Sequence, residues 1–283
     1  MNAPLIHELE KITGKDGVLT SPEDLAAYSY DATFEEHLPD VVVLPRSTQQ
    51  VSQVLMLASR EQIPLVTRGM ASGLAAGAVP LYGGIALSMT RMDRLLELDE
   101  KNAIAHVEAG MVTADLQAAV EARGLFYPPD PSSIRHSTIG GNIACNAGGP
   151  RCLKYGVTGD YVLGLTVVLA DGQILKTGGK AIKDVVGYDL KALFTGSEGT
   201  LGVITEALLR LIARPRFVRT ALVEFPSLDD AAGAVNAIIL SGIIPAAIEL
   251  MDSTAISCVE EAMQLGLPTD VEAILLIETD GQA

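Results

Sequence analysis

The apolar positions of the first 70 residues follow two periods in turn. VVVLP at 41–45 is a continuous apolar run with the length of a buried strand, and the next segment repeats apolar residues every three or four positions, as one face of a helix does (Val51, Val54, Leu55 and Ala58). Ser47 and Gln50 form a capping-box pattern at the start of this helix. Pro64 ends it, and PLVT is a second strand. The order predicts a compact β-α-β unit that leads directly into the glycine-rich segment RGMASGLAAGA.

Strand-like runs return beyond this segment. IALSM (85–89) and AIAHVEAG (103–110) are typical of strands joined by a charged turn. TADLQAAVEARG is typical of a short helix, with Thr113 as its N-cap and Gly124 just past its end. YVLGLTVVLADGQILKTG predicts a hairpin that turns at Asp171-Gly172, and LGVITEALLRLI predicts a further strand.

Residues 125–160 show almost no strand or helix period. This region is rich in Pro, Gly, Ser and Asn, and it contains the stretch STIGGNIACNAGGPRCLKYG at 137–156. A loop of this length inside a domain is usually functional or disordered. Because its small side chains bury little apolar area, we expect the protein to keep it for a ligand.

The composition changes near residue 214. From FVRTALVEF onward the pattern predicts a strand, a helix (227–240), a strand, a helix (253–265) and a strand, which is the opening of an α+β sandwich. We expect a domain of residues 1–214, with subdomains of approximately 1–90 and 91–214, followed by a domain of residues 215–283. The second domain is expected to be incomplete, because the chain stops soon after its last predicted strand.

Composition and charge exclude several classes of protein. The chain has 283 residues, 48% of them apolar, and a formal net charge of −15 without a basic cluster, so we predict no nucleic-acid binding. Three cysteines without a CxxC pair argue against a zinc or iron–sulfur site and indicate reduced thiols in the cytoplasm. The N-terminus lacks the pattern of a signal peptide, and no apolar run reaches the length of a membrane span.

Two glycine-rich loops carry the functional signal, TRGMASGLAAGA and the stretch at 137–156, which PPDPSS precedes. Glycine allows positive φ and close backbone approach, and successive exposed main-chain amides can hold a diphosphate. The spacing matches neither G-x-G-x-x-G nor the P-loop pattern. From these residues alone, long surface loops without a ligand remain the alternative.

The same motifs, with VVVLPRSTQQV and GYDLKALFTGSEGTLGVIT, resemble the vanillyl-alcohol-oxidase-type (PCMH-type) FAD-binding family over about residues 20–280, and within it the group of the glycolate oxidase FAD subunit and D-lactate dehydrogenase. The resemblance implies an α+β fold, with a two-subdomain PCMH-type FAD-binding domain followed by an incomplete ferredoxin-like substrate (cap) domain. It also implies FAD as cofactor.

The resemblance further implies which residues contact FAD. The loop at 68–74 would wrap the pyrophosphate, 130–132 would pass near the flavin and phosphates, and the 198–204 segment would flank the ribose and adenine side. The positions are Arg68, Gly69, Met70, Ala71, Ser72, Gly73, Leu74, Asp130, Pro131, Ser132, Thr138, Gly141, Asn142, Ala144, Gly148, Glu198, Gly199, Gly202 and Ile204.

The first loop departs from the family pattern R-G-x-G-T-G-L at two positions. Ser72 replaces Thr and keeps a hydroxyl, whereas Ala71 replaces a glycine. If that position needs a positive φ, Ala71 would be strained by about 1 kcal/mol. Relatives with covalent flavin have a histidine in this loop, and its absence here predicts noncovalent FAD.

The reaction implied by the resemblance is oxidation of a small 2-hydroxy acid, glycolate or D-lactate, by hydride transfer to flavin N5. No catalytic residue and no metal site is assigned; His7, His37, His106 and His136 are better interpreted as solvated or packing residues. Iron–sulfur and second flavin-type subunits are the implied partners of a cytoplasmic protein, which could lie at the inner face of the membrane. Two alternatives stay open: a flavin-binding or assembly module without turnover, and an enzyme like alkyl-dihydroxyacetone-phosphate synthase.

Overall fold

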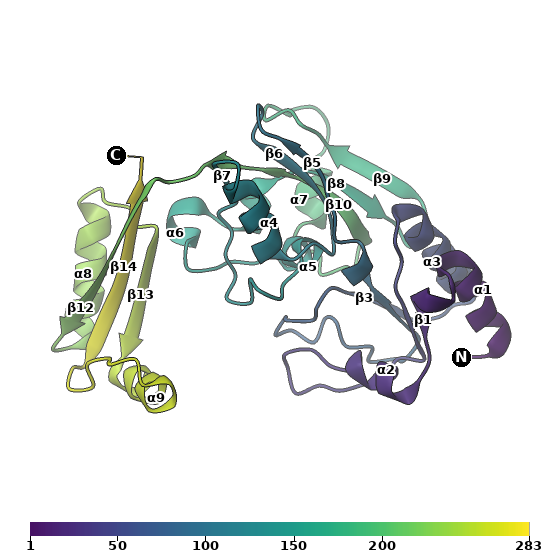
Figure 1. The fold of residues 1–283 in the computed structure, drawn as a ribbon, viewed down its shortest axis with the longest axis horizontal. Helices are drawn as coiled ribbons and strands as arrows, with labels where there is room; N and C mark the ends of the chain where they lie inside the picture. The colour runs from purple at the N-terminus through teal and green to yellow at the C-terminus, as the bar shows by residue number, and fades with distance from the viewer. Residues whose placement is uncertain (283) are drawn as a thin grey trace. The chain divides into compact units, whose positions relative to one another are not determined.

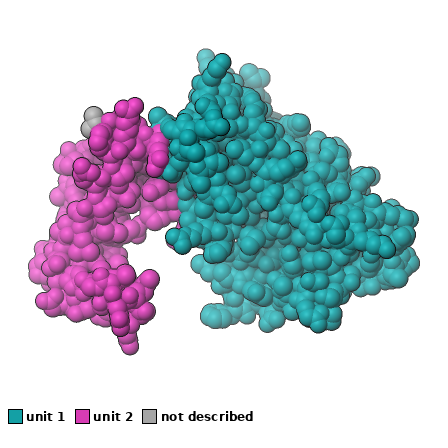
Figure 2. Space-filling model, viewed as in Figure 1, with its two compact units in different colours: residues 1–127, 133–147, 158–213 teal, residues 128–132, 148–157, 214–283 magenta. Residues whose placement is uncertain are grey.

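The protein forms two compact units in a computed structural model that describes residues 1–282 (Figures 1 and 2). Unit 1 comprises residues 1–127, 133–147 and 158–213, and unit 2 comprises 128–132, 148–157 and the residues from 214 onward. Two short segments of the glycine-rich region therefore group with the C-terminal part of the chain. The domain boundary at 214–215 stays a prediction.

Unit 1 begins with a four-stranded sheet in the order β1-β2-β4-β3. Its strands are β1 (Val18–Leu19), β2 (Val41–Val43), β4 (Ile85–Ser88) and β3 (Leu65–Arg68). The predicted strand-helix-strand order is confirmed, with helix α3 (Thr48–Arg60) capped by Ser47, whose hydroxyl accepts from the Gln50 amide. The two strands are not neighbours, however, because β4 lies between them and pairs in parallel with both. The apolar face of α3 packs against this sheet, in a core that α1 (Ala3–Thr13) also joins through Leu9.

The second sheet of unit 1 is antiparallel, in the order β5-β6-β10-β8-β9. Its strands are β5 (Leu95–Asp99), β6 (Ile104–Glu108), β10 (Val203–Arg210), β8 (Val162–Val168) and β9 (Ile174–Gly178). The predicted hairpin is confirmed: β8 pairs with β9, and Gly172 turns the chain between them at a φ of 85°. A separate two-stranded ladder joins β7 (Leu125–Phe126) to β11 (Ile212–Ala213).

The prediction of Thr113 as a helix N-cap was wrong. Helix α4 (Thr113–Glu121) has Val112 at its N-cap, and no side chain caps it. The Thr113 hydroxyl instead donates to the Ser137 carbonyl (3.0 Å) and accepts from the side-chain amide of Asn142 (2.7 Å). A buried tertiary network therefore uses the hydroxyl that the local pattern assigned to the cap.

The glycine-rich region is also more regular than predicted. It contains α5 (Ile139–Cys145), α6 (Cys152–Tyr155) and the 3₁₀ turn Thr158–Tyr161. Thr138 caps α5, because its hydroxyl accepts from the Gly141 amide at 3.3 Å. The helix is short, and its only large apolar residues are Ile139 and Ile143, which are too few to show a helical period in the sequence. The remaining short helices are α2 (Pro22–Ala27), α7 (Leu190–Phe194) and the 3₁₀ turns Lys15–Gly17 and Met89–Arg91.

Unit 2 contains an antiparallel sheet in the order β12-β14-β13, and the predicted element order is confirmed. Its elements are β12 (Phe217–Phe225), α8 (Leu228–Leu240), β13 (Ala247–Asp252), α9 (Ser253–Met263) and β14 (Ala273–Gly281). Side chains of Ser227 and Asp252 cap the two helices. Ala231 of α8 packs with Ala273 and Leu275 on one face of the sheet. Together the two units confirm the α+β class.

Candidate functional site

The loop that follows β3 offers a row of main-chain donors. Within the described residues, no amide between Met70 and Gly77 donates a hydrogen bond. Ala71 and Ala76 both have a φ of 54°, in the left-handed region that turns the chain sharply. Gly73 has open space around it, since an added Cβ would meet nothing within 4 Å. Unpartnered amides such as these, here called the amide cradle, are donors that an anion can accept from.

The two glycine-rich loops meet at Gly69. A Cβ added to Gly69 would lie 3.1 Å from Cβ and Cγ2 of Thr138 and would overlap its hydroxyl oxygen. Thr138 is 3% exposed and caps α5, so it has little room to move. Only glycine allows the first loop to approach the start of α5 this closely.

A third segment lies against the same helix. The amides of Gly196 and Glu198 donate to the carbonyls of Ile143 (3.0 Å) and Ala144 (2.9 Å) at the end of α5. Glu198 and Gly199 take positive φ values of 52° and 77° to make this turn. A Cβ added to Gly77 would lie 3.7 Å from the Glu198 carboxylate. The segments at 68–77, 138–144 and 196–199 therefore converge in unit 1.

Two other predicted contact residues, Gly202 and Ile204, pack within the second sheet of unit 1. Gly202 allows the close approach of β8, because a Cβ there would lie 2.8 Å from Val167 and 2.9 Å from the Val168 carbonyl. Ile204 is 6% exposed and pairs with Val167 in the sheet. Met70 and Leu74 are largely exposed at the first loop.

Arg68 places a buried cation where β3 ends. Its guanidinium donates to the Tyr28 carbonyl at 2.8 Å and lies 5.1 Å from the centre of the Tyr28 ring. Burial lowers the pKa of the guanidinium below its ordinary value, although Tyr28 and Asp31 oppose this effect. The Arg68 Nε is buried and has no partner within the described residues. A cation held without a carboxylate bond, at the start of a loop of free amides, favours an anionic ligand.

Four predicted contact residues belong to unit 2 and are described separately: Asp130, Pro131, Ser132 and Gly148. The Asp130 carboxylate accepts from the Arg151 amide at 3.3 Å. Burial raises the pKa of the Asp130 carboxyl above its ordinary value, and the Arg151 amide opposes this. The network around Arg151 is not visible in the sequence, because its partner Glu278 lies more than 120 positions further along the chain.

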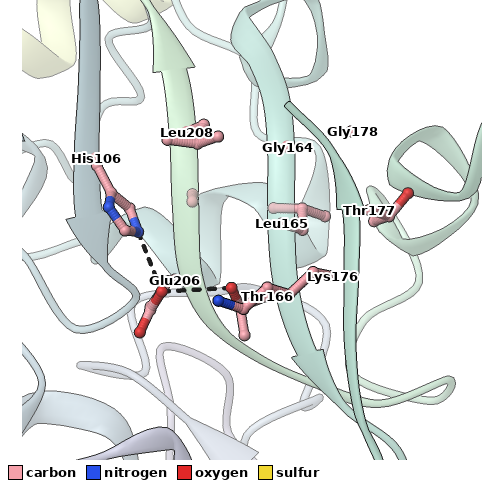
Figure 3. A pocket seen from close by; sticks show the side chains of 10 residues that line it. His106, Gly164, Leu165, Thr166, Lys176, Thr177, Gly178, Glu206 and Leu208 are labelled. Atoms are coloured by element: carbon pink, nitrogen blue, oxygen red, sulfur yellow. Dashed lines mark hydrogen bonds and ion pairs between the residues drawn. The ribbon is translucent and has the colours of Figure 1, made fainter. Parts of the chain in front are cut away.

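A hollow of about 140 Å³ lies on one face of the five-stranded sheet (Figure 3). His106 Nε2 lies 3.0 Å from Glu206 Oε2, which also accepts from the Thr166 hydroxyl at 3.3 Å (Figure 3). Lys176 lines the same hollow. No predicted FAD contact is among the residues that line this hollow.

The described residues contain no cluster of His, Cys, Asp and Glu that could hold a metal ion. Burial and the nearby Glu198 raise the pKa of the Cys145 thiol, which does not favour a reactive thiolate. No helix of the described chain combines the length and apolar character of a membrane span.

The strain at Ala71 gives a prediction for this loop. We expect Ala71→Gly to raise the free energy of unfolding by up to about 1 kcal/mol, because relief of the left-handed φ exceeds the extra unfolded-state entropy of glycine. Ala75→Gly is the matched control: Ala75 is absent from the positive-φ residues, so the same change should lower stability by about 0.4–1 kcal/mol. Urea unfolding measures both. Equal destabilisation by the two variants would contradict the strain.

The loops of unit 1 present unpartnered main-chain donors without a Rossmann or P-loop motif. Residues 39–178 match the FAD binding domain family, and residues 214–283 match the C-terminal domain of FAD linked oxidases. The chain is 48% identical over 275 residues to the glycolate oxidase subunit GlcD of Bacillus subtilis, which covers 97% of this chain and 58% of that protein. It is 35% identical over 287 residues to a D-lactate dehydrogenase of Anaerostipes hadrus, covering 99% and 60%. The chain thus spans roughly three fifths of the length of these relatives.

Solved structures agree on the fold. An alkyldihydroxyacetonephosphate synthase matches with a TM-score of 0.85 at 22% identity, over 99% of this chain and 56% of that one. A p-cresol methylhydroxylase matches with a TM-score of 0.81 at 18% identity, over 98% and 60%. The chain belongs to the FAD-linked oxidases, and it shares its fold with the p-cresol methylhydroxylase. FAD is its cofactor, and the cradle of free amides fits the diphosphate of that group.

Proposed function

We propose that the chain is the flavin-binding part of an enzyme that oxidises a small 2-hydroxy acid, glycolate or D-lactate, to the 2-oxo acid. The observation that carries the proposal is the loop of unpartnered amides between Met70 and Gly77, in a chain 48% identical to a glycolate oxidase subunit. Bound FAD supplies the site that accepts the hydride. Noncovalent binding remains part of the proposal, because no histidine occurs in the first loop.

The chain's own residues bind and orient the cofactor. The amides of residues 70–77 and the buried Arg68 cation hold the diphosphate, and Gly69 lets this loop lie against α5. The cofactor lies against α5 at Thr138, Gly141, Asn142 and Ala144. Glu198 and Gly199 lie at the far end of this helix. No side chain is assigned as the catalytic base.

Two alternatives stand beside this proposal. An enzyme of the alkyl-dihydroxyacetone-phosphate synthase kind shares the fold at 22% identity, whereas two relatives, 48% and 35% identical, are named for glycolate oxidase and D-lactate dehydrogenase. A flavin-binding module without turnover fits the loops equally well, and only a reaction separates it from an enzyme. An iron–sulfur subunit, a second flavin-type subunit and a cytoplasmic position, free or at the inner face of the membrane, belong to the proposal for the enzyme.

Anaerobic reduction of the bound flavin tests the proposal. The FAD-loaded chain is mixed with glycolate or D-lactate, with L-lactate as the control of handedness, and the visible flavin absorbance is followed. We expect bleaching by at least one of the first two acids. If FAD is bound and none bleaches it, while a full-length relative is bleached in parallel, the module without turnover is the better description.

A further inference from the structure

A buried carboxylate in unit 2 holds a segment of the glycine-rich region. Asp280 lies on β14, and its side chain is 4% exposed. Its carboxylate accepts from the Lys154 ammonium and, at 2.7 Å, from the Tyr155 hydroxyl. Lys154 also donates to the main-chain carbonyl of Asp280 at 2.9 Å. Charged hydrogen bonds to a buried group are among the strongest available, so β14 fixes the end of α6.

A second contact joins the same segment to the 128–132 segment. The Arg151 guanidinium lies between two carboxylates, with Nε 3.4 Å from Asp130 and 3.6 Å from Glu278 of β14. Gly149 makes this possible, because a Cβ there would collide with the main chain of Asp130. Glu278 and Asp280 point from the same face of the sheet, two residues apart on one strand. One face of β14 therefore carries both anchors.

We propose that Asp280 is a positioning residue for FAD: through Lys154 and Tyr155 it fixes the segment that carries Gly148, and Glu278 extends this hold through Arg151 to Asp130. The inference rests on the proposed function, because Asp130–Ser132 and Gly148 are expected cofactor contacts. It assigns to a strand of the C-terminal region a role in cofactor binding. The chain's affinity for FAD then depends on a side chain that is not expected to touch FAD.

The test compares two quantities in three variants: the dissociation constant for FAD and the rate of trypsin cleavage in the segment of α6. Asp280→Asn keeps the shape of the side chain and removes its charge. We expect its dissociation constant for FAD, from quenching of flavin fluorescence, to rise about tenfold. Without FAD, trypsin should cleave faster after Arg151 and Lys154. Tyr155→Phe removes one hydrogen bond only and should give a smaller change of both readouts, which keeps the test valid if Asp280→Asn folds poorly.

Glu249→Gln is the matched control. Glu249 lies on β13, is exposed, and its side chain has no polar partner among the described residues, so the same loss of charge should change neither readout. If wild-type and Asp280→Asn chains bind FAD equally well and are cleaved at equal rates, the positioning role is wrong. If the wild-type chain takes up no FAD, the proposed function fails instead.

Discussion

Gly69→Ala is expected to weaken FAD binding by about two orders of magnitude or more. The added methyl group would overlap the Thr138 hydroxyl, and Thr138 is buried and caps α5. Overpacking of this kind costs about 1–3 kcal/mol, and here it would separate the amide cradle from α5. We therefore expect a lower melting temperature together with a much higher dissociation constant for FAD, measured by calorimetry and by flavin fluorescence.

Gly73→Ala is the control for the loss of stability expected of Gly69→Ala. It makes the same chemical change four residues further along the loop, where an added Cβ meets nothing within 4 Å. The stability of the chain without FAD should be unchanged or slightly raised, because alanine restricts the unfolded chain. Thr138→Ala should restore part of the stability of Gly69→Ala. A Gly69→Ala chain that melts like the wild type would show that the two loops do not meet as described.

Asn142→Ala is expected to lower the free energy of unfolding by about 1–3 kcal/mol, because a buried hydrogen-bonding group loses its partner. Asn142 is 3% exposed and donates to the Thr113 hydroxyl, which in turn donates to the Ser137 carbonyl. This chain of hydrogen bonds ties α5 to α4. For a unit of this size the melting temperature should fall by about 2–4 °C per kcal/mol.

A double-mutant cycle with Thr113→Val tests whether these side chains act as one network. We expect the double variant to lose less stability than the sum of the two single variants, because each substitution already breaks the same bond. Strict additivity would contradict the network. Denaturant unfolding of the four chains gives the required free energies.

The apolar pattern predicted most strands and long helices, because their buried faces repeat at the period of the backbone. The insertion of β4 between β2 and β3 was not visible, since sheet order depends on packing between distant segments. Helix α5 was missed for a different reason: Ile139 and Ile143 are its only large apolar residues, and the cap at Thr138 becomes evident only in three dimensions. The same limit explains Thr113, whose hydroxyl bonds across 29 residues to Asn142.

The candidate site was accessible in part from the sequence. Glycine spacing indicated the two loops. The family glycine that Ala71 replaces pointed to a positive φ at this position, and Ala71 has one. The sequence could not show that Gly69 touches Thr138, that the 196–199 turn lies along α5, or that Asp280 holds the segment of Gly148. These contacts join residues about 50 to 130 positions apart, and no local pattern contains them.

FAD binding is expected to depend most on the main-chain amides of residues 70–77, on which its diphosphate would lie. Titration of the cofactor-free chain with FAD, FMN and riboflavin tests it directly, because only FAD has the diphosphate. We predict saturation with one equivalent of FAD and binding of riboflavin and FMN weaker by about 100-fold or more, since most of the charged hydrogen bonds are then absent. Riboflavin or FMN binding as tightly as FAD would contradict the account.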